Sequence, residues 1–236
     1  MRYQGGKSRI AKEIAGILNQ SNRGGQCFVS MFCGSCSVEA KVTGFNRMVL
    51  NDKHPYLIAM WQGLQNGYEL PDSISEQEYK FIRDHKGLDF VLTGFVGFAC
   101  SFGGKWFGGY ARSSTERNFA AQSKRSVLKD LATLKTAEFI CSDYRNLAIP
   151  MGAVIYADPP YANTTGYGNE KFDTEEFWNY MRLLADTGHQ VFISEQTAPD
   201  DFVCIWEKPF TRTLDRNKNN QFKVYERLYT YGGTKQ

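Results

Sequence analysis

The tetrapeptide Asp158-Pro159-Pro160-Tyr161 is the part of the sequence with the clearest chemistry. It follows an apolar run that is predicted as a strand, and two prolines without N–H groups force the chain to leave a sheet there. The carboxylate before the prolines and the aromatic ring after them are therefore held in a fixed relation. A carboxylate and a backbone carbonyl can accept the two N–H bonds of an aromatic amine, which frees the nitrogen lone pair for attack. The motif favours methylation of an exocyclic amino group, with Tyr161 available to stack on the base. A Pro-Pro loop with a capping aspartate is the structural alternative.

A second feature is the small-residue loop Phe32-Cys33-Gly34-Ser35-Cys36, which follows the apolar run 26–32. Small residues let the backbone approach a ligand, and the helix expected after the loop would offer its N-terminus. The Cys-x-x-Cys spacing could also indicate a redox or zinc site. No second pair of Cys or His residues completes such a site, so we expect free thiols and no metal.

Acidic residues end two further predicted strands. Asp52 lies roughly 20 residues after the small-residue loop, a spacing that suits an acid on a ribose diol. Asp143 ends the strand predicted over 137–143, where a carboxylate can accept a hydrogen bond from an adenine amino group. Each aspartate could instead cap a helix.

The elements that must position these residues alternate along the chain. Helical spacing of apolar residues and helix-end signals predict helices over 7–19, 38–45, 54–65, 75–85 and 174–188, the last capped by Thr174. Short apolar runs predict strands at 26–32, 47–52, 137–143, 153–161 and 190–195, and the tail is expected to form two strands around an Asn/Lys-rich turn. Alternation of this kind predicts a parallel sheet with helices on both faces, and an antiparallel hairpin can close it.

The segment between the second and third strands is too long, at roughly 80 residues, for a plain crossover connection. We expect residues 54–135 to form an inserted, mainly helical lobe, and residues 1–53 and 136–236 to form the sheet domain. No apolar run approaches the roughly 18 residues that span a bilayer. No secretory leader is recognised, so a cytoplasmic protein without a membrane association is expected.

Basic residues are concentrated in three segments, although the net charge is only +3. The ranges 1–25, 105–125 and 212–227 each carry five Lys or Arg residues against one or two acids. Such a distribution suits a basic face for a polyanion, and solvated surface charge is the alternative. The Gly-rich, aromatic stretch 103–115 has the character of a DNA contact, or otherwise of an aromatic core hairpin with exposed charges.

Taken together, these motifs resemble the Dam-like, D12 class of N6-adenine DNA methyltransferases, which use S-adenosylmethionine. Tyr3-Gln4-Gly5-Gly6-Lys7 is similar to that family's W/Y-x-G-G-K motif, the loop 32–36 to its F-x-G-x-G motif, and the 158–161 tetrapeptide matches its catalytic motif in full. The strand ends at 50–52 and 141–144 and the tail at 223–232 are also similar to family motifs. Two departures stand out, because Cys36 replaces the second glycine and Ser30-Met31 stands where many relatives have an acid and a proline.

The resemblance implies a Rossmann-like class I methyltransferase sheet of the α/β class, with a C-terminal antiparallel hairpin and an inserted target-recognition lobe. It implies catalytic roles for Asp158, Pro159 and Tyr161. The cofactor-binding residues it implies are Tyr3, Lys7, Phe32, Gly34, Ser35, Asp52, Asp143 and Asp158. The DNA contacts that we expect in the lobe are Lys105, Trp106, Tyr110, Arg112 and Arg117. Expected partners are double-stranded DNA and, as a candidate, a cognate restriction endonuclease in a bacterial or phage-infected cell.

Other functions stay open on the sequence alone. A methyltransferase acting on RNA or on protein glutamine could use a similar tetrapeptide, whereas cytosine-N4 enzymes more often have Ser before the prolines. A DNA-binding protein with a silent methyltransferase fold is compatible with the altered loop, although the intact tetrapeptide argues against it. A nicotinamide-dependent dehydrogenase would need a G-x-G-x-x-G loop, which residues 32–37 do not supply.

Overall fold

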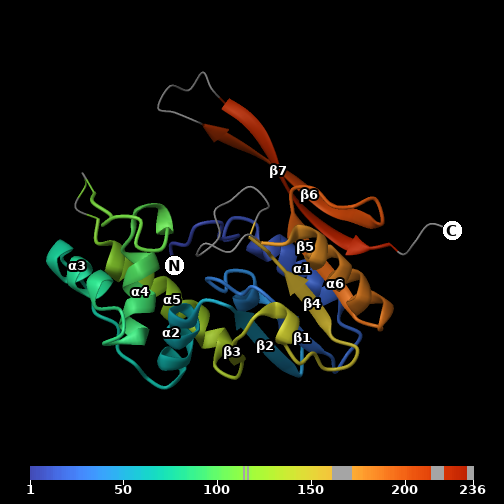
Figure 1. The fold of residues 1–236 in the computed structure, drawn as a ribbon, viewed down its shortest axis with the longest axis horizontal. Helices are drawn as coiled ribbons and strands as arrows, with labels where there is room; N and C mark the ends of the chain where they lie inside the picture. Colours follow the sequence, from blue (N-terminus) through green and yellow to red (C-terminus); the bar gives the residue numbers. More distant parts are fainter. Residues whose placement is uncertain (114, 116, 161–171, 214–220, 233–236) are drawn as a thin grey trace.

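A computed structural model of the protein describes residues 1–113, 115, 117–160, 172–213 and 221–232. The strands of these residues form a seven-stranded sheet in the order β3-β2-β1-β4-β5-β7-β6 (Figure 1). The strands are β1 (Cys27–Ser30), β2 (Arg47–Asp52), β3 (Glu138–Cys141), β4 (Val154–Ala157), β5 (Gln190–Glu195), β6 (Phe202–Thr213) and β7 (Gln221–Tyr231).

Strands β1 to β5 are parallel, and β7 runs antiparallel between β5 and β6. Every residue of the central strands β1 and β4 is buried, as expected where both faces of a parallel sheet are covered. The predicted α/β sheet with a closing antiparallel hairpin is therefore confirmed. The carboxyl ends of the parallel strands lie at one edge of the sheet. The direction in which successive strands are added changes between β1 and β4, and ligands of such sheets bind at this switch point.

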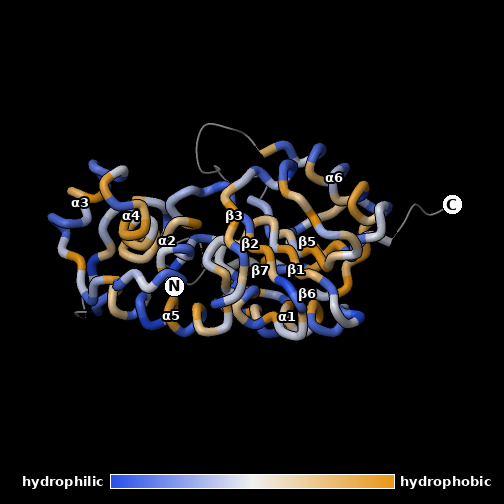
Figure 2. The backbone as a smooth tube through the Cα atoms, turned by 90° about the horizontal axis from the view of Figure 1, so that it is seen from below, coloured by the Kyte–Doolittle hydropathy of each residue, from blue (hydrophilic) through white to orange (hydrophobic). Residues whose placement is uncertain are grey.

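Helices cover both faces of the sheet (Figure 2). Helix α1 (Ala11–Ser21) packs on one face and α6 (Thr174–Asp186) on the other, and each face has its own apolar cluster. The N-cap of α6 is Asp173, whose side chain accepts the backbone N–H of Glu176. The expectation that Thr174 caps this helix is wrong, because Thr174 is already its first helical residue.

Four helices lie beside the sheet in the segment between β2 and β3 (Figure 1). They are α2 (Pro55–Gln65), α3 (Glu76–Asp84), α4 (Phe90–Ala99) and α5 (Phe119–Leu134). Their buried residues belong to the same apolar cluster as those of α1, so the core continues from the sheet into these helices. The division of the chain at residues 54 and 135 stays a prediction.

The helix predicted over 38–45 is wrong beyond one turn. Only a 3₁₀ turn, η1 (Glu39–Lys41), forms there. Val42 is extended, and Gly44 has a φ of +84°, so the helical path cannot continue. The consequence is that Glu39 stands in a tight turn directly after the small-residue loop.

The six cysteines are free, and four of them are buried, whereas Cys141 and Cys204 are exposed. In the described part of the chain, no helix is both long and apolar enough to cross a membrane. Over the same residues, no group of three His, Cys, Asp or Glu side chains is arranged to hold a metal ion.

Candidate active site

A cavity of about 920 Å³ lies at the carboxyl ends of β1, β2, β3 and β4. Its wall also includes the N-terminal segment and residues 105–106 from the loop after α4. Every cofactor-binding residue expected from the sequence lines it, namely Tyr3, Lys7, Phe32, Gly34, Ser35, Asp52, Asp143 and Asp158. Pro159, Lys105 and Trp106 line it too, and Tyr161 lies outside the described residues. One cavity is thus lined by residues of the N-terminal motif at 3–7 and of the motif that begins at Asp158.

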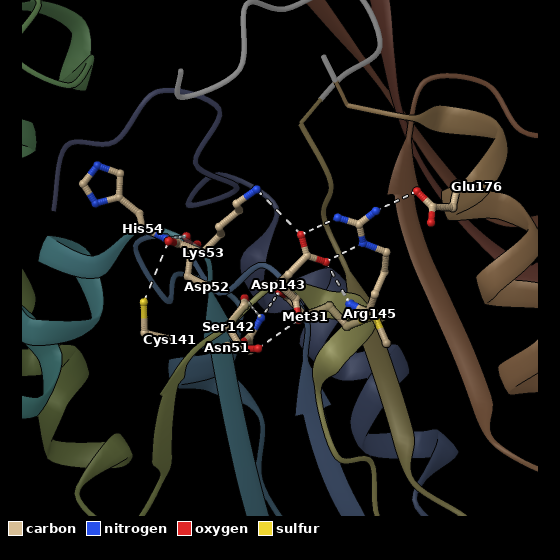
Figure 3. A network of polar contacts seen from close by, with 10 residues as sticks. All are labelled: Met31, Asn51, Asp52, Lys53, His54, Cys141, Ser142, Asp143, Arg145 and Glu176. Atoms are coloured by element: carbon tan, nitrogen blue, oxygen red, sulfur yellow. Dashed lines mark hydrogen bonds and ion pairs between the residues drawn. The ribbon is translucent and has the colours of Figure 1, made fainter. Parts of the chain in front are cut away.

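Asn51 lines this cavity and links the ends of three strands by hydrogen bonds (Figure 3). Its side-chain Nδ2 donates to the carbonyl oxygens of Met31 and Ser142, each at 3.0 Å. Asn51 is only 1% exposed, and these bonds join the end of β2 to the segments that follow β1 and β3. The sequence analysis did not single out Asn51 as a site residue, although a buried amide at a strand end was a signal that could have found it.

Asp52 holds the small-residue loop with both carboxylate oxygens. Oδ2 accepts the Gly34 N–H at 3.0 Å, and Oδ1 accepts the His54 N–H at 2.9 Å. Gly34 has a φ of +50°, and a Cβ there would lie 3.0 Å from the Tyr3 ring. Burial raises the pKa of Asp52, while the two backbone donors lower it. Because each oxygen keeps a second lone pair, Asp52 can still accept a hydrogen bond from the hydroxyl group of a ligand in the cavity.

Cys36, which replaces the second glycine of the loop motif, adopts the left-handed backbone conformation with a φ of +53°. Its N–H donates to the Cys33 carbonyl at 2.8 Å, so the loop keeps a tight turn at the cost of some backbone strain. Burial raises the pKa of the Cys33 thiol to about 11 and that of Cys36 well above its usual range. Both thiols are therefore protonated at neutral pH and are poor nucleophiles.

Asp143 lies in an ion-pair network at the end of β3 (Figure 3). Arg145 contacts both of its oxygens, at 2.7 and 2.8 Å, and the Lys53 Nζ is 3.7 Å away. Hydrogen bonds from Arg145 are the largest influence that lowers the pKa of Asp143, to about 2. Arg145 also reaches Glu176 at 2.9 Å. Lys53, Arg145 and Glu176 line the cavity but were missed by the sequence analysis, because they meet only after β3 and α6 are packed.

Asp158 is paired with Lys7 across the site. The Lys7 Nζ lies 2.8 Å from Oδ1 of Asp158 and 3.7 Å from a carboxylate oxygen of Glu226 on β7. The Lys7 side chain is only 5% exposed, whereas 21% of the Asp158 side chain is exposed. Burial raises the pKa of Asp158, and the Lys7 charge and hydrogen bond lower it. Among the described residues, Oδ2 of Asp158 has no hydrogen-bond partner, so this oxygen can accept a further hydrogen bond.

An aromatic wall borders the cavity on the side of the helices. The Trp106 ring lies 4.3 Å from His54 and is stacked at 5.5 Å on Tyr56, measured between ring centroids. A Cβ on Gly97 would lie 2.2 Å from the Trp106 ring, so only glycine lets this ring pack on α4. Burial lowers the pKa of His54 to about 4, and this imidazole is therefore neutral at physiological pH.

The residues expected to contact DNA differ in their surroundings. Lys105 and Trp106 line the cavity, whereas the Tyr110 hydroxyl donates to the Ile74 carbonyl at 2.7 Å and its ring packs on Tyr79. Arg112 is exposed and pairs with Glu76 at 2.7 Å, and Arg117 is exposed. The aromatic part of this segment is therefore built into the helical core more than the sequence analysis assumed.

Comparisons with known proteins give the following likenesses. Residues 3–87 match the family model described as D12 class N6 adenine-specific DNA methyltransferase. A comparison with curated proteins found no match. Among solved structures, yhhF, a candidate methyltransferase from Escherichia coli, is 14% identical, with a TM-score of 0.41 over 94% of this chain and 84% of that chain. The rRNA methyltransferase aviRa from Streptomyces viridochromogenes is also 14% identical, with a TM-score of 0.41 over 95% and 86% of the two chains.

The segment that matches the family model contributes part of the cavity wall. The matched segment contains the N-terminal motif, the small-residue loop and Asp52, all of which line the cavity. The remaining part of the cavity wall, with Asp143 and Asp158, follows the matched segment in the sequence. Residues 3–87 are therefore similar to the D12 class N6 adenine-specific DNA methyltransferases.

Proposed function

We propose that the protein is a site-specific DNA adenine-N6 methyltransferase that takes its methyl group from S-adenosylmethionine. The observation that carries this proposal is the order of carboxylates along the edge of the sheet. Asp52 is the last residue of β2, Asp143 and Asp158 follow β3 and β4, and all three line one cavity. In this order, Asp143 would accept a hydrogen bond from the adenine amine of the methyl donor and Asp52 from its ribose. Asp158, at the far end of the row, would accept one from the base that receives the methyl group.

The cavity fits this donor in size and chemistry. Its volume of about 920 Å³ lies within the range of pockets that enclose a small-molecule cofactor. The unused lone pairs of Asp52 could accept hydrogen bonds from ribose hydroxyls, and the small residues of the loop would let its backbone approach the ligand. Bound there, S-adenosylmethionine would supply an electrophilic methyl group.

Asp158 and Pro159 would hold the target amine. Asp158 Oδ2 would accept one N6 hydrogen and the Pro159 carbonyl the other. This would localise the nitrogen lone pair for in-line attack on the methyl carbon, while the bond between that carbon and the donor sulfur breaks and the thioether leaves. The nitrogen then loses one proton, with Asp158 or water as the acceptor. The two nearby thiols are protonated, so no covalent enzyme intermediate is needed or favoured. Lys7 keeps Asp158 in its charged, accepting form by pairing with Oδ1.

The proposal of DNA as substrate is supported by the surroundings of the cavity. Lys105 is an exposed cation on the cavity rim, and Trp106 presents an aromatic face beside it. A flipped base needs an aromatic or apolar surface for stacking, and the phosphates beside it need cations. The expected restriction endonuclease partner and the bacterial or phage setting belong to this proposal as well.

The direct test is transfer of a labelled methyl group. The purified protein is incubated with labelled S-adenosylmethionine and, in separate reactions, with unmethylated double-stranded DNA and with RNA, and the products are digested to nucleosides. The proposal expects label in N6-methyladenine from DNA. Label in adenine from RNA alone would show an RNA methyltransferase, and DNA binding without any label would show a silent binding protein. Sequencing the methylated DNA from expressing cells would then return the recognition site.

A further inference from the structure

Glu39 is a buried carboxylate in the wall of the cavity that neither the motifs nor the family match assigns to a role. The residue is 3% exposed and begins the η1 turn directly after the small-residue loop. Its Oε1 accepts a hydrogen bond from the Ser30 hydroxyl at 2.7 Å, and the nearby backbone N–H groups of Glu39 and Val38 lower the pKa of the carboxyl. The Ser30 contact orients the Glu39 side chain, and Glu39 is one of the residues that line the cavity.

The carboxylate of Glu39 has no cationic partner within the described chain. The groups that influence it are acidic or neutral: Asp158 after β4, the Ser30 hydroxyl on β1, and the Cys33 and Cys36 thiols of the loop. A buried charge without a counter-ion is costly, and proteins usually avoid it by pairing or by protonation. Burial, with a contribution from Asp158, raises the pKa of Glu39 to about 7. A cation brought by a ligand would remove this penalty.

The position of Glu39 along the sheet edge indicates which part of a ligand it meets. Strand β1 lies between β2, which ends at Asp52, and β4, which precedes Asp158. A methyl donor with its ribose at Asp52 and its reactive methyl near Asp158 places its remaining substituent, the amino-acid part, above the end of β1. That part carries an α-ammonium group, which is a donor of charge-assisted hydrogen bonds to a carboxylate.

We propose that Glu39 binds the α-ammonium group of the methyl donor and that Ser30 is the positioning residue that orients the Glu39 carboxylate. This inference rests on the proposed function and extends it by naming the residues that would recognise the amino-acid part of the methyl donor. It makes the site specific for adenosine derivatives that keep the amino acid. It also predicts that donor binding is linked to the loss of a proton from Glu39.

The test is calorimetry of Glu39→Gln with two ligands. S-adenosylmethionine carries the ammonium group, and 5′-methylthioadenosine has the same nucleoside and sulfur without the amino acid. The variant should lose about 10- to 100-fold in affinity for the first ligand, the usual scale for a charge-assisted hydrogen bond, and keep its affinity for the second. Ser30→Ala should show a smaller loss with the same selectivity. Glu195→Gln is the matched control, because burial also raises the pKa of Glu195 to about 7 but this residue does not line the cavity.

A second measurement uses the unaltered protein. At pH 7, binding of S-adenosylmethionine in buffers with different heats of ionisation should release a substantial fraction of a proton, and binding of 5′-methylthioadenosine should release much less. Equal affinity of Glu39→Gln for S-adenosylmethionine, an equal loss for both ligands, or no difference in proton release would overturn the inference. In these cases, intact methylation would leave the proposed function standing, whereas failure of the unaltered protein to bind S-adenosylmethionine would overturn the proposed function itself.

Discussion

Asp52 combines a structural and a binding task in one side chain, because the oxygens that hold Gly34 and His54 are also those expected to meet the ribose. Replacing Asp52 by Ala should weaken binding of S-adenosylmethionine by about 1–3 kcal/mol, the loss expected for hydrogen bonds to a charged group. Calorimetry on the folded variant measures this, with Asp52→Asn as a comparison that keeps one acceptor oxygen. Unchanged affinity of a folded Asp52→Ala protein would contradict the assignment.

Glu39 should make the ligand-free protein sensitive to pH. Its pKa is about 7 in the fold against an ordinary value of 4.5, so the folded state binds more protons between these values. Stability contributed by protonated Glu39 is therefore lost as the pH rises from about 4.5 through 7. Above pH 7, Glu39→Gln should be more stable than the unaltered protein by about 3 kcal/mol, and below about pH 4 the difference should be small. Urea unfolding at both pH values tests this, and a difference that is independent of pH would refute it.

At the scale of single residues, the sequence predicts those groups that belong to a local motif. Asp52, Asp143 and Asp158 each follow an apolar run, and all three line the cavity. Glu39 could not be found in this way, because it was assigned to the start of a predicted helix over 38–45, of which only one 3₁₀ turn forms. Arg145 was missed for a different reason, since its contact with Glu176 joins two segments 31 residues apart.

Among the elements, the loop after α4 carries the expected DNA contacts. Charge reversal at Lys105, which lines the cavity, should reduce DNA affinity and flatten its salt dependence while cofactor binding is kept. Charge reversal at Arg112 should also reduce DNA affinity, although this variant additionally loses the ion pair with Glu76. Glu76→Gln breaks the same ion pair but keeps the cation, so it is the matched control. Normal DNA binding by both reversed variants at several salt concentrations would assign the loop another role.

The packing of Trp106 on α4 gives a second prediction for an element. In Gly97→Ala, the new methyl would lie 2.2 Å from the Trp106 ring, so the ring must move away from the cavity wall. We expect a loss of about 1–3 kcal/mol in stability from overpacking, together with reduced methylation. Gly16→Ala in α1 is the control, because nothing lies within 4 Å of its new methyl and the helix should become more stable. Unfolding and methylation assays with Gly97→Ala near normal would show that the wall does not depend on this glycine.

Prediction of the elements succeeded where the apolar pattern was unambiguous. The runs at 47–52 and 190–195 form β2 and β5 with the predicted bounds. Helix α5 was not predicted, because its buried positions are spread along a segment rich in Ser, Lys and Arg. The predicted helix over 38–45 illustrates the opposite error, since extended Val42 and the positive φ of Gly44 end it after one turn.

At the scale of the whole molecule, the N-terminal segment connects the helices with the sheet. The Gln4 N–H donates to the Gly104 carbonyl at 3.0 Å, and Lys7 reaches Asp158 at 2.8 Å. A Cβ on Gly104 would lie 2.6 Å from the Tyr3 nitrogen, so this close approach requires glycine. The sequence predicted parallel strands and helices on both faces but could not give the strand order or the pairing of Lys7 with Asp158, because contacts between distant segments leave no local pattern.

The central claim is that Asp158 activates an adenine amine for methyl transfer in DNA. The measurement that tests it most directly is the single-turnover rate of methylation of a cognate DNA duplex by the unaltered protein and by Asp158→Ala, with cofactor affinity measured in parallel. Asp158→Ala should fold and bind S-adenosylmethionine but lose methylation by at least about 100-fold, the scale for removing one positioned group from a transition state. Asp158→Asn should keep some activity through its amide oxygen, and Cys33→Ser and Cys36→Ser should stay within a small factor of the unaltered rate. An active Asp158→Ala protein, or a Cys33→Ser protein that binds cofactor without methylating DNA, would contradict the account.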